Sequence, residues 1–184
     1  MNTYSELAEI LAAKQKQILD IWTERTLGTY SAPGFFKKSL DPFANPVGVQ
    51  IRSGLAALFE LLRDQAEPAA FVGPLDQVIR IRAVQDFTAS QAVVPFLELK
   101  WVVKEVLAQE LQRRLLADQL NEFECAVERM ALVGFDLYCQ CREQLYRNRI
   151  QELKSGRARF TDGGCPSRFL DAAARQEQME NMRK

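Results

Sequence analysis

The sequence has no histidine among its 184 residues. Serine–histidine and cysteine–histidine catalysis, histidine-ligated zinc and a histidine-ligated haem are therefore excluded. A glycine-rich phosphate loop is also missing, and the carboxylates occur as scattered surface charges along the predicted helices. We therefore expect a protein that is not an enzyme, with no catalytic residues, no metal and no cofactor.

The sequence also has no excess of charge of one sign and no long apolar run. The 24 basic residues balance 24 acidic ones, which argues against a nucleic-acid binder. The N-terminus has no basic flank leading into an apolar stretch, so we expect no signal peptide. No apolar run approaches the roughly 18 residues that span a bilayer. We therefore expect a cytoplasmic protein without membrane insertion.

Helical periodicity dominates the rest of the sequence and predicts an all-α fold of about five helices. The first runs from Thr3, in a Thr-x-x-Glu capping box, to about residue 28. The second begins at Asn45 as N-cap, the third near Pro74 and the fourth at residue 88 or 90. Pro95 lies inside this fourth helix and should bend it. The fifth runs from about residue 118 to 153.

The fifth predicted helix carries apolar residues on two faces. On one face the residues are spaced alternately by four and three positions, as they are where two helices pack together. These residues are Phe123, Val127, Met130, Gly134, Leu137 and Cys141. Leu132, Phe135 and Cys139 form the second face. Such a helix is either central to the core or shared with a second chain. The first face therefore supplies our candidate interface for a homodimer, and a central core helix is the alternative.

The end of the chain differs from the rest in charge. Residues 147–184 hold nine basic and five acidic residues, a net +4, which leaves 15 − 19 = −4 for residues 1–146. Large apolar groups are few there. We therefore expect a domain over residues 1–153 and a flexible tail over 154–184, with docking of a short tail helix onto a partner as the functional alternative.

One polar cluster falls on a predicted core-facing stripe. One turn beyond the apolar residues of the third predicted helix, the same core-facing side carries Arg82 and then Gln85 or Asp86. Either Arg82 and Asp86 form a structural pair, or the cluster binds a small anionic or polar ligand or acts as a buried switch. Arg80 and Trp22 complete the ligand or switch candidates. We expect both tryptophans, Trp22 and Trp101, to be buried in the core.

The four cysteines include one C-x-C pair, Cys139 and Cys141. Two helical residues at this spacing point to opposite sides, so they cannot share an ion. We interpret the helical cysteines as small packing residues. Cys165, in a Gly-Gly-Cys-Pro segment, is the thiol we expect to be reactive.

Three segments in order resemble a known family. They are Ile21-Trp22-Thr23-Glu24-Arg25, then Asp41-Pro42-Phe43-Ala44-Asn45-Pro46-Val47-Gly48, then Ile79-Arg80-Ile81-Arg82-Ala83-Val84-Gln85-Asp86-Phe87. Together with Ser90-Gln91-Ala92-Val93, they are similar to the RsbRD N-terminal domain, the sensory half of RsbT co-antagonist proteins. The resemblance covers about residues 5–150.

The resemblance implies a haem-free, globin-like helical bundle that dimerises and passes a signal to a STAS domain or a histidine kinase. Stand-alone members near membrane electron-transfer complexes add a redox-complex subunit to the possible partners. No segment after residue 153 is long enough for a STAS domain, so we expect the output to lie on another protein. The alternative is a small-ligand or redox-sensing protein that uses the cluster of Arg82, Gln85 and Asp86, or the cysteines.

Overall fold

The computed structural model describes residues 4–30, 33–34, 43–85, 87–108 and 116–155. All its regular elements there are helices: α1 (Tyr4–Gly28), α3 (Pro46–Arg63), the 3-10 helix η1 (Pro68–Phe71), α4 (Val72–Ala83), α5 (Ala89–Val106) and α6 (Ala117–Lys154). The predicted all-α class is confirmed. The helix η1 was not predicted, because a single 3-10 turn has no periodic apolar pattern.

The starts of two helices follow from their capping residues. Asn45 accepts a hydrogen bond from the backbone N–H of Gly48 at 2.9 Å, and Pro46 occupies the first turn of α3. Thr88 and Gln91 form a reciprocal capping box at the start of α5. Both starts agree with the sequence patterns. The other predicted cap, Thr3, lies outside the described residues.

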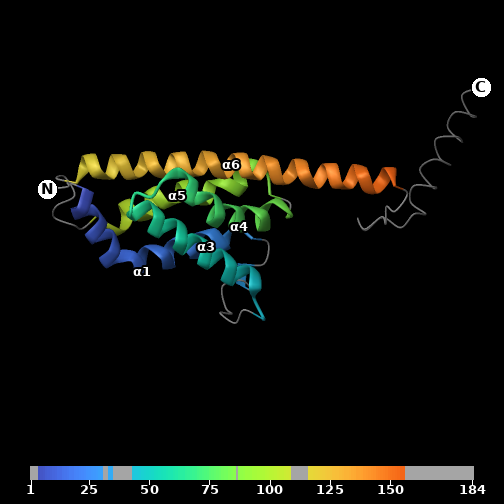
Figure 1. The fold of residues 1–184 in the computed structure, drawn as a ribbon. Coiled ribbons are helices and arrows are strands. Elements are labelled where there is room, and N and C mark those ends of the chain that lie inside the picture. Colours follow the sequence, from blue (N-terminus) through green and yellow to red (C-terminus); the bar gives the residue numbers. More distant parts are fainter. Residues whose placement is uncertain (1–3, 31–32, 35–42, 86, 109–115, 156–184) are drawn as a thin grey trace, which may run out of the picture. The chain divides into compact units, whose positions relative to one another are not determined.

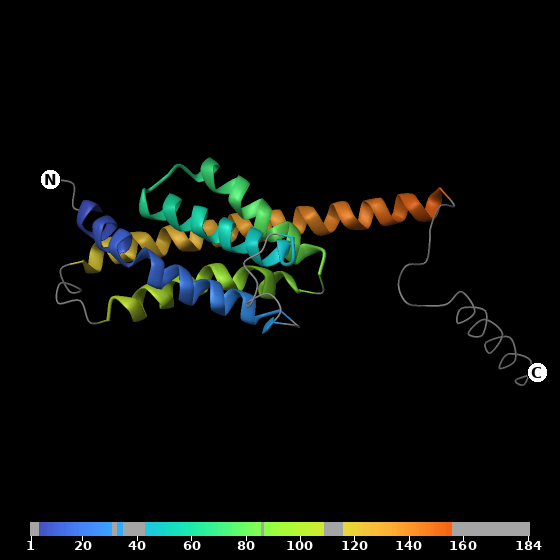
Figure 2. The same ribbon diagram turned by 90° about the horizontal axis from the view of Figure 1, so that it is seen from below.

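The chain divides into two compact units, residues 1–143 and 144–184. In the first unit α1 packs against α3 and α5, and α3 packs against α4 (Figure 1). Figure 2 shows α1 alongside α5. A Cβ atom at Gly54 would lie 2.5 Å from Cγ2 of Val78, so glycine permits the close approach of α3 to α4.

The first predicted face of α6 is buried within the single chain. Phe123 and Val127 are fully buried and Met130 is 3% exposed. A Cβ atom at Gly134 would lie 3.3 Å from Phe96. Leu137 and Cys141 are partly buried against the same core. These six side chains therefore have packing partners within the single chain, as the alternative of a central core helix expects, and the homodimer interface stays a prediction.

The described part of the second unit is the end of α6 from Gln144, followed by Ser155. The predicted tail and its cysteine, Cys165, lie outside the described residues. Within the described ranges, none of the helices combines the length and the apolar character needed to cross a membrane.

Candidate functional site

The turn between α4 and α5 is built around a buried cation, Arg82. Its relative exposure is 0%, because it continues the core-facing stripe of Leu75, Val78 and Ile79 on α4. A buried guanidinium is expensive unless it is hydrogen-bonded, so its partners show what it does.

Arg82 bonds a backbone carbonyl that Pro95 leaves without a helical donor. In α5 the carbonyl of Gln91 would normally accept from the N–H four residues later, which is position 95, and proline has no N–H. Nη2 of Arg82 donates to that carbonyl at 2.8 Å and to Oγ1 of Thr29 at 3.1 Å. The buried arginine therefore completes the hydrogen bonding of an interrupted helix.

Trp22 supports the same stretch of α5. It is fully buried, as expected, and its indole Nε1 donates to the carbonyl of Pro95 at 2.6 Å. Two of the predicted candidates, Arg82 and Trp22, thus bond the backbone of α5 around a single proline. Neither role requires a ligand.

Two aromatic rings enclose the guanidinium. Its central carbon lies 4.1 Å from the ring centroid of Phe87 and 5.2 Å from that of Tyr30, and the two rings contact each other edge-on at 5.1 Å. Burial lowers the pKa of Arg82, while Tyr30 and then Glu98 favour the charged form. Burial raises the pKa of Tyr30, and the charge of Arg82 opposes that rise. Arginine remains charged and tyrosine neutral at pH 7.

The turn is also fixed to α6. The hydroxyl of Tyr138 donates to the carbonyl of Phe87, and Nη1 of Arg142 donates to the carbonyl of Ala83 at 3.0 Å. Both acceptors flank the α4–α5 turn. Two hydrogen bonds from α6 side chains to backbone carbonyls therefore join the turn to α6 within the first unit.

The other predicted candidates do not join Arg82. Arg80 is exposed and pairs with Asp76 at 2.5 Å on the surface of α4. Gln85 is partly buried, and its backbone N–H bonds the carbonyl of Arg82 at 3.3 Å. Asp86 lies outside the described residues, so the predicted Arg82–Asp86 pair stays a prediction.

Nε and Nη1 of Arg82 have no hydrogen-bond partner within the described part of the chain. This buried, incompletely bonded cation is the feature that favours a ligand or switch role. The sequence indicated the arginine but not its environment, because Thr29, Tyr30 and Phe87 come from segments outside the helical pattern of α4.

Several large apolar side chains are exposed. Trp101 is 64% exposed, so the prediction that it is buried is wrong: its position on α5 faces away from the core. On α6, Leu132 is 67% and Phe135 43% exposed, and Cys139 is exposed beside them. In the second unit, Leu145, Tyr146, Ile150 and Leu153 are each at least 38% exposed.

The described cysteines are free thiols in different environments. Cys139 is exposed, whereas Cys125 and Cys141 are partly buried. Burial and the nearby charge of Asp76 raise the pKa of Cys141, against the opposing effect of Arg80. In the part of the chain that the structure describes, no three His, Cys, Asp or Glu side chains come together as a metal site would require.

The first unit is thus an all-helical bundle in which buried and partly buried polar groups hold the α4–α5 turn. The family model for the RsbT co-antagonist protein rsbRD N-terminal domain matches residues 16–153, and the chain belongs to this family. The family indicates a sensory domain of stress-response signalling. Neither a curated protein nor a solved structure gives a match.

Proposed function

We propose that this protein is a non-enzymatic sensory or adaptor module of signal transduction, in stress-response or redox-metabolism regulation, and that it acts through protein–protein contacts. The family match over residues 16–153 carries the proposal. Its partners are a STAS-domain protein, a kinase or a subunit of a redox complex. The module works in the cytoplasm as a homodimer.

The α4–α5 turn is the proposed signalling element. A partner or ligand that displaces the turn changes the acceptors of Tyr138 and Arg142, since these side chains bond the carbonyls of Phe87 and Ala83. The displacement then favours one of two packings of α6. The polar contacts that join the turn to α6 support this mechanism.

Affinity co-purification of the tagged full-length chain from its native host, under anaerobic conditions, tests the proposal. We expect a STAS protein, a kinase or a redox-complex subunit in fixed ratio, and the same complex when the purified components are mixed. Comparison with a chain lacking residues 154–184 locates the contact, because the predicted tail is the alternative docking segment. Recovery of the protein alone in both experiments contradicts the adaptor function.

A second candidate function is supported by Nε and Nη1 of Arg82, which lack partners within the described residues. A small anion could bond them if the α4–α5 turn opened, which would make the protein a ligand sensor. Thermal unfolding with and without small carboxylates or phosphate tests this candidate. An Arg82→Met variant that loses the ligand-induced rise in Tm supports it, and an unchanged Tm of the native protein in all ligands contradicts it.

A further inference from the structure

An apolar groove of about 760 Å³ lies between α3, η1 and α6 in the first unit. Leu62, Phe71 and Met130 form part of its lining and are buried. Leu132 also lines the groove and is 67% exposed. A volume of roughly 300–1,000 Å³ with a mainly apolar lining is typical of small-molecule sites. The groove therefore has the size and the lining of a ligand site, separate from the junction around Arg82.

The groove is elongated along α6. Its lining residues on this helix begin at Asn121 and end at Val133, which are 133 − 121 = 12 positions apart. This separation corresponds to about 18 Å of helix at the usual rise per residue. The end of α3 and η1 supply the rest of the lining. A groove of this length suits an elongated apolar molecule better than a small ion.

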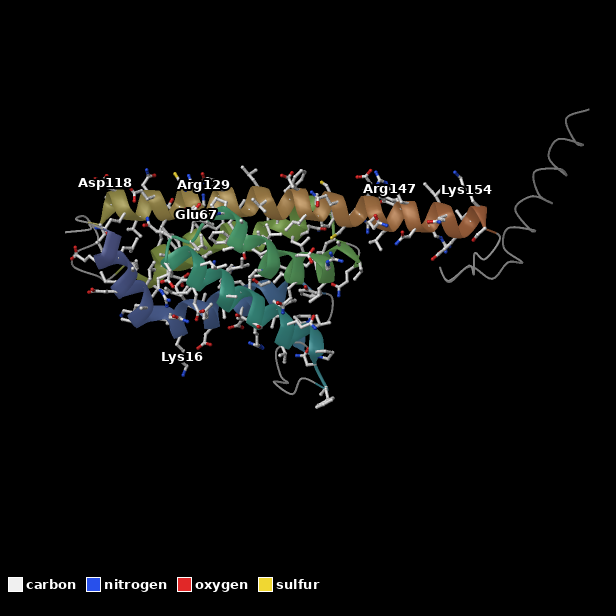
Figure 3. All side chains as sticks on the ribbon, in the orientation of Figure 1. Lys16, Glu67, Asp118, Arg129, Arg147 and Lys154 are labelled. Carbon is white, nitrogen blue, oxygen red and sulfur yellow. The ribbon has the colours of Figure 1, made fainter. Side chains whose placement is uncertain are left out.

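Four of the lining residues are polar: Gln65, Asn121, Glu122 and Arg129. The first two are amides, which both donate and accept hydrogen bonds. Arg129 lies on α6 about two turns after Glu122 (Figure 3). Both of these charged residues are exposed, and no ion pair joins either of them to another residue in the described ranges. Their opposite charges cancel in the lining, and exposed charges attract a charged ligand only weakly.

We propose that the groove binds a neutral amphiphile, in which an elongated apolar chain or ring system carries an uncharged hydroxyl or carbonyl head group. The apolar lining removes the body of the ligand from water, which supplies most of the affinity. A charged head group would lose its hydration against this lining and find only exposed charges in return. A hydroxyl or carbonyl group loses less hydration and bonds the amide of Gln65 or Asn121.

The groove adjoins the segment that leads to the Arg82 junction. Phe71 is the last residue of η1, and α4 begins at the next residue, Val72, and ends at Ala83. A ligand in contact with both Phe71 and Met130 therefore touches η1 and α6 at once. The amphiphile is then the signal of the sensory module. This consequence rests on the function proposed above, whereas the binding itself does not.

Three ten-carbon probes test the head group: decanol, decanoate and decylamine. Each is titrated below its micellar concentration against the purified full-length chain, in competition with the neutral fluorophore Nile red. We expect decanol to bind more tightly than either charged probe by about fivefold or more, because only its head group enters the groove without losing the hydration of a charge. Equal or tighter binding of decanoate or decylamine overturns the neutral class. Failure of all three to bind overturns the ligand site.

Substitutions in the lining test the location. Leu132→Asp should weaken decanol binding about tenfold or more, because it adds a charge to the wall of the groove at a residue whose exposure lets the fold persist. Phe135→Asp is the matched control, since Phe135 is an exposed apolar residue of the same helix outside the lining. Ala126→Phe, which fills the groove, should give a similar loss without a new charge. Equal decanol affinities of Leu132→Asp and Phe135→Asp overturn the assignment to this groove.

The ligand site and the adaptor function can fail separately. Binding is measured on the purified protein alone, so a protein that binds no probe rejects the amphiphile even where a signalling partner co-purifies. Decanol binding without any partner supports the ligand site and contradicts the adaptor function. A purified partner that is lost with Leu132→Asp, in a protein that binds no probe, assigns the groove to a protein contact and overturns the ligand inference.

Discussion

Replacing Arg82 by methionine should destabilise the protein, and replacing Pro95 by alanine should remove part of that cost. Methionine keeps the apolar stem of the side chain and deletes both hydrogen bonds made by Nη2. The carbonyl of Gln91 then loses the donor that Arg82 supplies. An alanine at position 95 supplies the missing helical N–H to that same carbonyl.

The magnitudes follow from the bonds that are lost. A hydrogen bond from a charged donor contributes about 1.5–3 kcal/mol, and Arg82 makes two from Nη2. Relief from burying the guanidinium offsets part of the loss. We expect Arg82→Met to lower the free energy of unfolding by about 2–4 kcal/mol. In the Pro95→Ala background we expect this cost to fall by about 1–2 kcal/mol, within the usual coupling range for residues in one network.

Urea unfolding of the four proteins in this double-mutant cycle measures the coupling free energy. Trp22→Phe is a matched control, because its partner, the carbonyl of Pro95, persists when Pro95 becomes alanine. We expect additive effects for Trp22→Phe and non-additive effects for Arg82→Met. Additive effects for both would refute the assignment of Arg82 as the donor that replaces the missing N–H of position 95.

Three further predictions concern packing, capping and thiol reactivity. Gly134→Leu should destabilise the isolated chain by about 2–3 kcal/mol in urea unfolding, because a side chain there overpacks against Phe96; unchanged stability would contradict the core position of α6. Asn45→Ala should lower the free energy of unfolding by about 1–2 kcal/mol through loss of its N-cap bond, and a loss under a few tenths would contradict that role. Cys139 should be alkylated before Cys141 between pH 7 and 9, because burial and the raised pKa of Cys141 lower its thiolate fraction. Peptide mapping that finds the reverse order would contradict this difference in burial.

The helices could be predicted because their signals are local. The capping patterns at Asn45 and Thr88 and the apolar spacing of α6 all act within a few residues, and the structure has helices at these places. The face of α6 that contacts the core was not decided by its own sequence. Apolar residues spaced by four and three positions can pack against a helix of the same chain as well as against one from a second chain.

The polar junction could be predicted only in part. The periodicity of α4 indicated that Arg82 faces inward, and the sequence showed that Pro95 removes a donor. Their connection is a tertiary contact between different helices, so no spacing rule contains it. Trp101 shows the opposite failure: an apolar residue on a helical pattern was assigned to the core, although single large apolar side chains are common on protein surfaces.

Amide hydrogen exchange of the full-length chain, alone and with a purified signalling partner from the same host, tests the central claim most directly. The account predicts that the partner changes exchange both near the α4–α5 turn and in α6 around Tyr138 and Arg142. It also predicts that Tyr138→Phe uncouples the two regions, because that hydroxyl bonds the carbonyl of Phe87. Unchanged exchange in both regions on addition of a STAS protein, a kinase or a redox-complex subunit would contradict a module that signals through this junction.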